Sequence, residues 1–84
     1  MQRNIEIVAK LLEILQKNPN AFVSLDDWAL AAKAGGIKSP HEFTHHFYLA
    51  RDKGLIAHEP TSNDYRLTWD GHDYLESRQN SGLF

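Results

Sequence analysis

The N-terminal segment carries an apolar repeat that is wide for a helix, and this feature limits most strongly what the chain can fold into. Apolar residues recur there at helical spacing, and further ones widen the apolar arc to about half of the helix circumference. The first set is Ile5, Val8, Leu12 and Leu15, and the second set is Ile7, Leu11 and Ile14. The pattern predicts a helix over residues 4–18 that needs cover on two sides. Either the rest of the domain covers it, or a second copy or another partner does.

The chain is short and has no cysteine. A chain of 84 residues forms one domain and buries only about 60–65% of the surface that its unfolded form exposes. No disulfide or thiolate metal site can add to this small core. No apolar run approaches the roughly 18–20 residues of a membrane span, so we expect a cytoplasmic protein without a membrane partner. The expected domain covers residues 1–80, with a short C-terminal tail at 81–84.

Two serines mark the starts of two further helices. Ser24 and Ser39 each stand where a side-chain oxygen can cap a helix, and an acidic residue follows each of them three positions later. Pro40 suits the first helical position after its serine. The helices predicted from these signals cover residues 25–34 and 40–53, and glycine follows both.

The next part of the chain predicts a hairpin that leads into a fourth helix. Residues 55–59 and 65–69 resemble strands around a polar loop, and residues 22–23 form a further short extended piece. Thr68 suits the N-cap of the fourth helix, which places Gly71 in the first turn. Glycine costs up to about 1 kcal/mol relative to alanine inside a helix. We therefore expect another stretch of backbone to pass close to Gly71.

The order helix, short strand, helix, tight turn, helix, hairpin, helix resembles that of winged helix-turn-helix proteins. Two motifs strengthen the resemblance to bacterial regulators of this class, namely Gly-Leu-Ile at 54–56 and Leu-Thr-x-x-Gly-x-x-x-Leu at 67–75. The resemblance implies a mainly α (α+β) fold, a winged helix-turn-helix with four helices and a small antiparallel wing hairpin.

More closely, the chain is similar to the uncharacterised bacterial and phage family called domain of unknown function 2513. The specific part of the match is Arg-Leu-Thr-Trp-x-Gly-His at 66–72, which corresponds to the closing motif of that family. The match over residues 46–50 is looser, since Phe and Ala replace leucines, and residues 3–6 depart further. The family has no settled activity, so the resemblance implies a fold and a phage or prophage setting.

In winged-helix proteins the third helix usually enters the major groove of DNA, and the wing contacts the backbone or the minor groove. A helical projection of residues 40–53 places Phe43, Phe47 and Ala50 on the core side. The opposite face carries His41, Thr44, His45, Tyr48 and Asp52. The nearby cations are Lys38 before the helix, Arg51 on its flank and Arg66 in the wing. The candidate DNA-binding residues are therefore Lys38, His41, Thr44, His45, Tyr48, Arg51 and Arg66.

The charge of the chain counts against strong DNA binding. Nine Lys and Arg stand against eleven Asp and Glu, for a net charge of −2, and no segment forms a basic block. The expected reading face has none of the Arg, Lys, Asn or Gln side chains that make bidentate base contacts, and Asp52 would repel phosphate. The alternative is a protein-binding module on the same scaffold, such as a phage accessory or host-inhibitory protein. The candidate interface residues of this module are Ile7, Leu11, Ile14 and Tyr48. The first three lie on the first helix, through which a homodimer could also form.

No residue pattern predicts a catalytic site. His41 and His45 are four residues apart on one helix side, as two metal ligands would be, but no third ligand is evident. Two solvated polar residues are the favoured interpretation, so we expect no cofactor. There is no cysteine nucleophile and no P-loop, and Ser24 and Ser39 are assigned to helix caps. The chain is therefore not expected to be an enzyme.

The remaining histidines and the large aromatic residues are assigned to structure. His46 is expected to be a hydrogen-bonded residue at the edge of the core, and His72 to pack or cap at the start of the fourth helix. Trp28 and Trp69 are expected to fill the core, each with a partner for its indole N–H. Tyr48 is the aromatic residue expected to be exposed.

Overall fold

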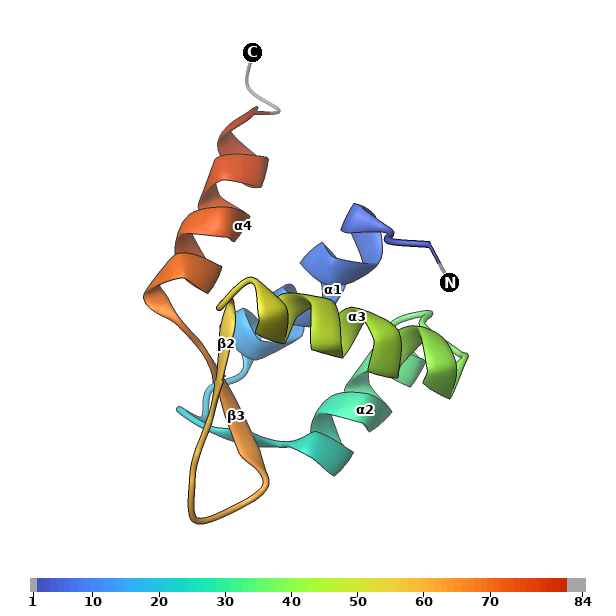
Figure 1. Cartoon of the computed structure of the whole chain (residues 1–84), viewed down its shortest axis with the longest axis vertical. Coiled ribbons are helices and arrows are strands. Elements are labelled where there is room, and N and C mark those ends of the chain that lie inside the picture. Colours follow the sequence, from blue (N-terminus) through green and yellow to red (C-terminus); the bar gives the residue numbers. More distant parts are fainter. Residues whose placement is uncertain (1, 82–84) are drawn as a thin grey trace.

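The computed structural model describes residues 2–81, with side chains as far as Arg78. These residues form a small α+β fold of four helices and one three-stranded antiparallel sheet (Figure 1). In chain order the elements are α1 (Ile5–Lys17), β1 (Val23–Ser24), α2 (Leu25–Ala34), α3 (Pro40–Asp52), β2 (Ile56–His58), β3 (Asp64–Leu67) and α4 (Trp69–Ser81). Ser81 belongs to α4, and the rest of the expected tail lies outside the described residues. No helix among the described residues is long and apolar enough to cross a membrane.

The observed helices follow the predicted ones closely, because local capping signals set their ends. Ser24 Oγ accepts from the Asp27 N–H at 3.2 Å, and Ser39 Oγ accepts from the Glu42 N–H at 3.4 Å. Helix α2 has the predicted bounds, and α3 ends one residue before the predicted end, at Asp52.

The sheet has the strand order β1-β3-β2, with β3 in the middle. The predicted hairpin is confirmed as the β2–β3 pair, although both strands are shorter than expected. The short extended piece before α2 is β1, where Val23 is in register with Tyr65 on β3. The short strand was predicted one residue earlier, at 22–23, but its pairing with β3 was not, because the partner residues lie some forty positions away and no local pattern encodes that distance.

Helix α1 lies at the centre of the fold and contacts α2, α3, α4 and β3. The interpretation that the rest of the domain covers its wide apolar arc is therefore confirmed. Leu11 is fully buried, so the expectation that it belongs to an exposed interface is wrong. Ile7 and Ile14 are half-buried and pack against the core, which leaves little of the apolar arc free for a partner.

Trp28 lies in the core, as predicted. It is fully buried, and its Nε1–H donates to the Leu11 carbonyl oxygen at 3.0 Å. Its ring meets those of Phe43 and Phe47 edge to face, with centroids 5.4 and 5.6 Å apart. The same expectation for Trp69 is wrong, because this side chain is 82% exposed. Trp69 begins α4 on its outer side, roughly opposite the buried Gly71.

The prediction that another stretch of backbone passes close to Gly71 is confirmed at the junction between β3 and α4. A Cβ atom at Gly71 would collide with the Leu55 carbonyl oxygen and with the Leu67 side chain. Thr68 Oγ1 accepts from the Gly71 N–H at 3.0 Å and donates to the Gly54 carbonyl oxygen at 2.7 Å. One hydroxyl therefore caps α4 and joins it to the turn after α3.

His72 follows in the same turn and departs from its prediction. Its side chain is exposed, so it does not pack against the core. Its backbone N–H donates to the Thr68 carbonyl oxygen at 3.0 Å, which is an ordinary helical bond.

Figure 1 shows the C-terminal part of α4 extending beyond the other elements. Arg78 connects it to the start of α1 through an ion pair with Glu6 at 3.1 Å.

Candidate nucleic-acid interface

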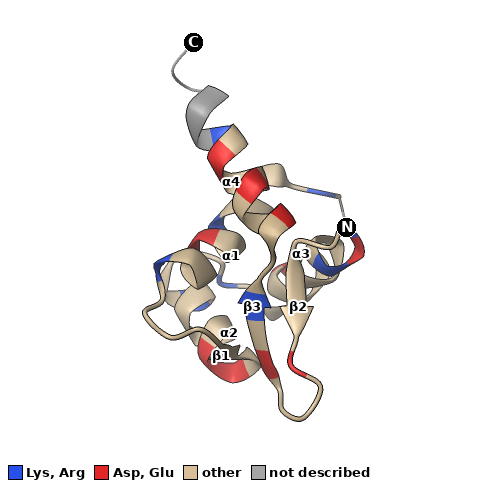
Figure 2. Cartoon of the chain, turned by 90° about the vertical axis from the view of Figure 1, so that its left-hand side faces the viewer, with Lys and Arg blue, Asp and Glu red and all other residues tan. Residues whose placement is uncertain are grey.

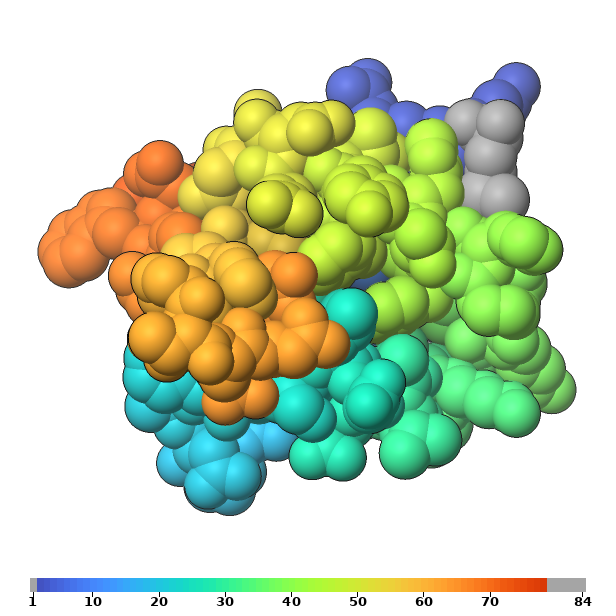
Figure 3. All heavy atoms as spheres, turned by 60° about the horizontal axis from the view of Figure 1, so that its bottom comes forward, coloured from blue at the N-terminus to red at the C-terminus, as the bar shows by residue number. Residues whose placement is uncertain are grey.

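The outer face of α3 is open, as the helical projection predicts. His41, Thr44 and Asp52 are exposed, and Tyr48 is 52% exposed. Its inner face, with Phe43, Phe47 and Ala50, is buried in the core. Figure 3 shows α3 and the tip of the β2–β3 hairpin on the same face of the molecule. Polar side chains of α3 can therefore reach a ligand that also meets the hairpin.

His46 fixes α3 to the start of α1. It is 1% exposed, and both of its ring nitrogens have backbone partners. The Asn4 N–H donates to Nε2 at 3.0 Å, and Nδ1 lies 2.7 Å from the Glu42 carbonyl oxygen. Since the first partner can only donate and the second can only accept, these contacts define the neutral tautomer with the proton on Nδ1. The predicted structural role of His46 is confirmed.

Asn4 extends this connection into α1. Its side-chain Oδ1 accepts from the Glu6 N–H at 2.9 Å, which makes Asn4 the N-cap of the helix. The same residue therefore caps α1 and donates to His46 of α3. The position of the outer face of α3 is thus set from the buried side of the helix.

His45 is half-buried, unlike its exposed neighbours on this face. Its Nε2 atom is buried without a hydrogen-bond partner in the protein, and its ring meets that of His46 edge to face at 4.9 Å. No group of three or more His, Cys, Asp or Glu side chains among the described residues is placed to hold a metal ion. The pair of His41 and His45 therefore has no third ligand in this part of the chain.

The predicted cations lie around α3 rather than on its outer face. Lys38 precedes the helix, Arg51 lies in its last turn, and both are exposed. Arg66 is exposed on β3, and its Nη1 donates to the Leu67 carbonyl oxygen at 3.4 Å. Figure 2 shows acidic residues at the start of α2 and along α4, while Lys and Arg are scattered over several elements. In this view the Lys and Arg positions of the described residues do not gather on one element.

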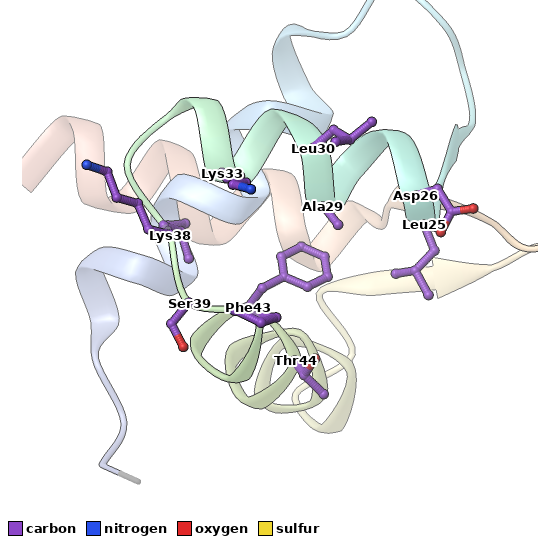
Figure 4. A pocket seen from close by; sticks show the side chains of 11 residues that line it. Leu25, Asp26, Ala29, Leu30, Lys33, Lys38, Ser39, Phe43 and Thr44 are labelled. Carbon is purple, nitrogen blue, oxygen red and sulfur yellow. The ribbon is translucent and has the colours of Figure 1, made fainter.

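A groove between α2 and α3 was not predicted from the sequence. It encloses about 580 Å³, and Ala29 and Phe43 point into it (Figure 4). Lys33 and Lys38 lie at one end, and Asp26 lies at the other. The sequence signal for such a groove is weak, because the apolar residues of α2 are mostly alanines and do not form a clear stripe.

Comparison with known proteins gives no relative for this chain. No protein-family model matches it, and neither a curated protein nor a solved structure matches it. The interface has to be judged from the geometry and chemistry of its own residues.

Proposed function

We propose that this chain is a small winged-helix protein that binds double-stranded DNA and acts as a transcription regulator of the phage or prophage type. The observation that carries the proposal is the arrangement around α3. The elements follow the order α1-β1-α2-α3-β2-β3-α4, the sheet has the order β1-β3-β2, and the outer face of α3 is open. A winged helix-turn-helix uses these parts to place one helix in the major groove and its hairpin beside it.

In this proposal the residues around α3 have two roles. His41, Thr44 and Tyr48 face the major groove, where hydroxyl and imidazole groups bond to base edges or phosphate oxygens. Lys38 and Arg66 neutralise phosphates on either side of the helix. With so few cations and with Asp52 on the same face, we expect modest affinity and a shallow dependence on salt.

Fluorescence anisotropy of a labelled DNA duplex, titrated with the protein over a series of salt concentrations, tests the proposal. We expect binding that weakens with salt, with a slope that falls by about 0.9 for each phosphate contact removed. Lys38→Ala and Arg66→Ala should each reduce the slope by that amount. Lys17→Ala is the matched control, because Lys17 is exposed in the last turn of α1 and belongs to neither α3 nor the hairpin. Absence of binding at low salt, or an equal effect of Lys17→Ala, would contradict the proposal.

The second candidate is a protein-binding module on the same scaffold, such as a phage accessory or host-inhibitory protein. Its support is the exposed apolar surface, since Leu30 is 66% exposed and Trp69 is 82% exposed. Aromatic side chains of this kind are common anchors of protein interfaces. This function predicts no DNA binding at any salt concentration. A pull-down in which Tyr48→Ala or Trp69→Ala loses the captured partner would support it.

A further inference from the structure

Trp69 is the most exposed large apolar side chain among the described residues. Tryptophan is usually buried for most of its surface, because it contributes a large apolar area. Asp73 and Glu76 follow it at positions i+4 and i+7, so they lie on the same side of α4, and both are exposed. This side of α4 therefore presents one indole ring next to two carboxylates.

The groove between α2 and α3 has the opposite character. Its interior is apolar, and its volume of about 580 Å³ falls within the range of about 300–1,000 Å³ that is usual for ligand sites. Lys33 and Lys38 both lie toward one end of it, and Leu30 lies exposed on its α2 side (Figure 4). Asp26 is at the far end, so the charge along the groove is unequal and would orient an occupant.

We propose that a second copy of this chain occupies the groove, with Trp69 of one copy inserted between α2 and α3 of the other. Asp73 and Glu76 then face Lys33 across the contact, and Lys38 keeps its role toward DNA. Trp69 is too exposed to lie in the groove of its own chain. A two-fold axis repeats the contact, so that each copy gives one indole ring and receives one.

The expected area is compatible with such a dimer. Each inserted tryptophan buries about 150–250 Å² of its own surface, and the groove walls lose a similar area. Two exchanged contacts therefore bury about 600–1,000 Å² in all, which is at the low end of specific interfaces and fits a weak dimer that forms with rising concentration. The first helix, by contrast, has little apolar surface left for this purpose, since Leu11 is fully buried.

Sedimentation velocity of the full chain over a range of concentrations tests the proposal. We expect a monomer–dimer equilibrium, and Trp69→Ala should raise the dissociation constant by about tenfold or more. Phe22→Ala is the matched control, because Phe22 is another aromatic residue that is 41% exposed and does not line the groove. A chain that stays monomeric at every concentration overturns the proposal, and so does an equal effect of the control. Species larger than a dimer overturn the two-fold exchange.

Charge reversal gives a second test that does not depend on removing the indole ring. The variants Lys33→Glu and Asp73→Lys/Glu76→Lys change only exposed residues, and circular dichroism checks that each remains folded. Each variant alone places like charges at both contacts, so we expect it to be monomeric. A mixture of the two variants restores opposite charges at both contacts, so we expect heterodimers. A mixture that stays monomeric overturns the proposed pairing.

Discussion

At the residue scale, the junction between β3 and α4 depends on the absence of a side chain at Gly71. The Leu55 carbonyl oxygen and the Leu67 side chain occupy the space that a Cβ atom would need. The carbonyl is backbone and also accepts from the Thr68 N–H at 3.1 Å, so it cannot move without loss of that bond. This position therefore requires glycine for space rather than for an unusual backbone angle.

Gly71→Ala is expected to destabilise the protein by about 1–3 kcal/mol, the usual cost of forcing an extra group into a packed site. Urea denaturation monitored by circular dichroism measures the change. Gly35→Ala is the control, because a Cβ atom there would make ordinary contacts with the Ala31 and Ala32 carbonyl oxygens, and the φ angle of Gly35 is −84°. A Gly71→Ala protein as stable as the Gly35→Ala protein would show that the junction can open without cost.

His46 is a second residue on which the position of α3 depends. His46→Ala removes a buried ring and leaves the Asn4 N–H without its partner, so we expect a loss of about 2–4 kcal/mol of unfolding free energy. His72→Ala, at an exposed site, should change stability by no more than about 0.5 kcal/mol. Thermal and urea unfolding of the two variants should rank them in this order. Equal stabilities would mean that the contact between α3 and Asn4 contributes nothing.

At the element scale, local signals predicted where helices begin and end, but not how their faces are used. The serine and threonine caps are read from neighbouring residues, and their hydrogen bonds are present at Ser24, Ser39 and Thr68. Strand β1 depends on a distant partner, so its pairing could not be read locally. Tryptophan is usually a core residue, but Trp69 is 82% exposed at the start of α4, and its own local sequence does not predict this.

The face of α3 was predicted more completely than the groove beside it. Its polar residues follow directly from helical geometry, as the exposure of Tyr48 illustrates. The groove depends on the packing of α2 against α3, where Ala29 leaves space above Phe43. A sequence gives no direct measure of such a gap, because both helices have weak amphipathic patterns.

The start of α4 offers a test at the same scale. Thr68→Val keeps the shape of the side chain but removes the hydroxyl that caps α4 and bonds to the Gly54 carbonyl oxygen. We expect a loss of about 1–2 kcal/mol in urea denaturation. Thr44→Val, on the exposed face of α3, is the matched control and should be nearly neutral. If the two threonines proved equivalent, the hydroxyl of Thr68 would not be what secures the junction.

At the scale of the whole molecule, one small core holds all the elements together, and Trp28 lies where they meet. Its indole N–H bonds to α1, and its ring contacts two aromatic residues of α3 and lies 6.0 Å from that of Tyr65 on β3. The chain contains two tryptophans, and the other one, Trp69, lies outside this core. The two residues therefore report on opposite environments, the shared core and the outer surface.

Trp28→Phe is expected to cost about 1–3 kcal/mol of unfolding free energy, because it removes the bond to the Leu11 carbonyl oxygen and leaves space in the core. Trp69→Phe should be nearly neutral in dilute solution, since its side chain is 82% exposed.

Fluorescence gives an independent readout of the same difference. The emission of Trp69 in the Trp28→Phe protein should be red-shifted and readily quenched by acrylamide, whereas that of Trp28 in the Trp69→Phe protein should be blue-shifted and protected. Equal quenching of both variants in their folded states would contradict the assignment of Trp28 to the core and Trp69 to the surface. If the quenching of Trp69 then decreases as the protein concentration rises, the same experiment also detects its insertion into a second copy.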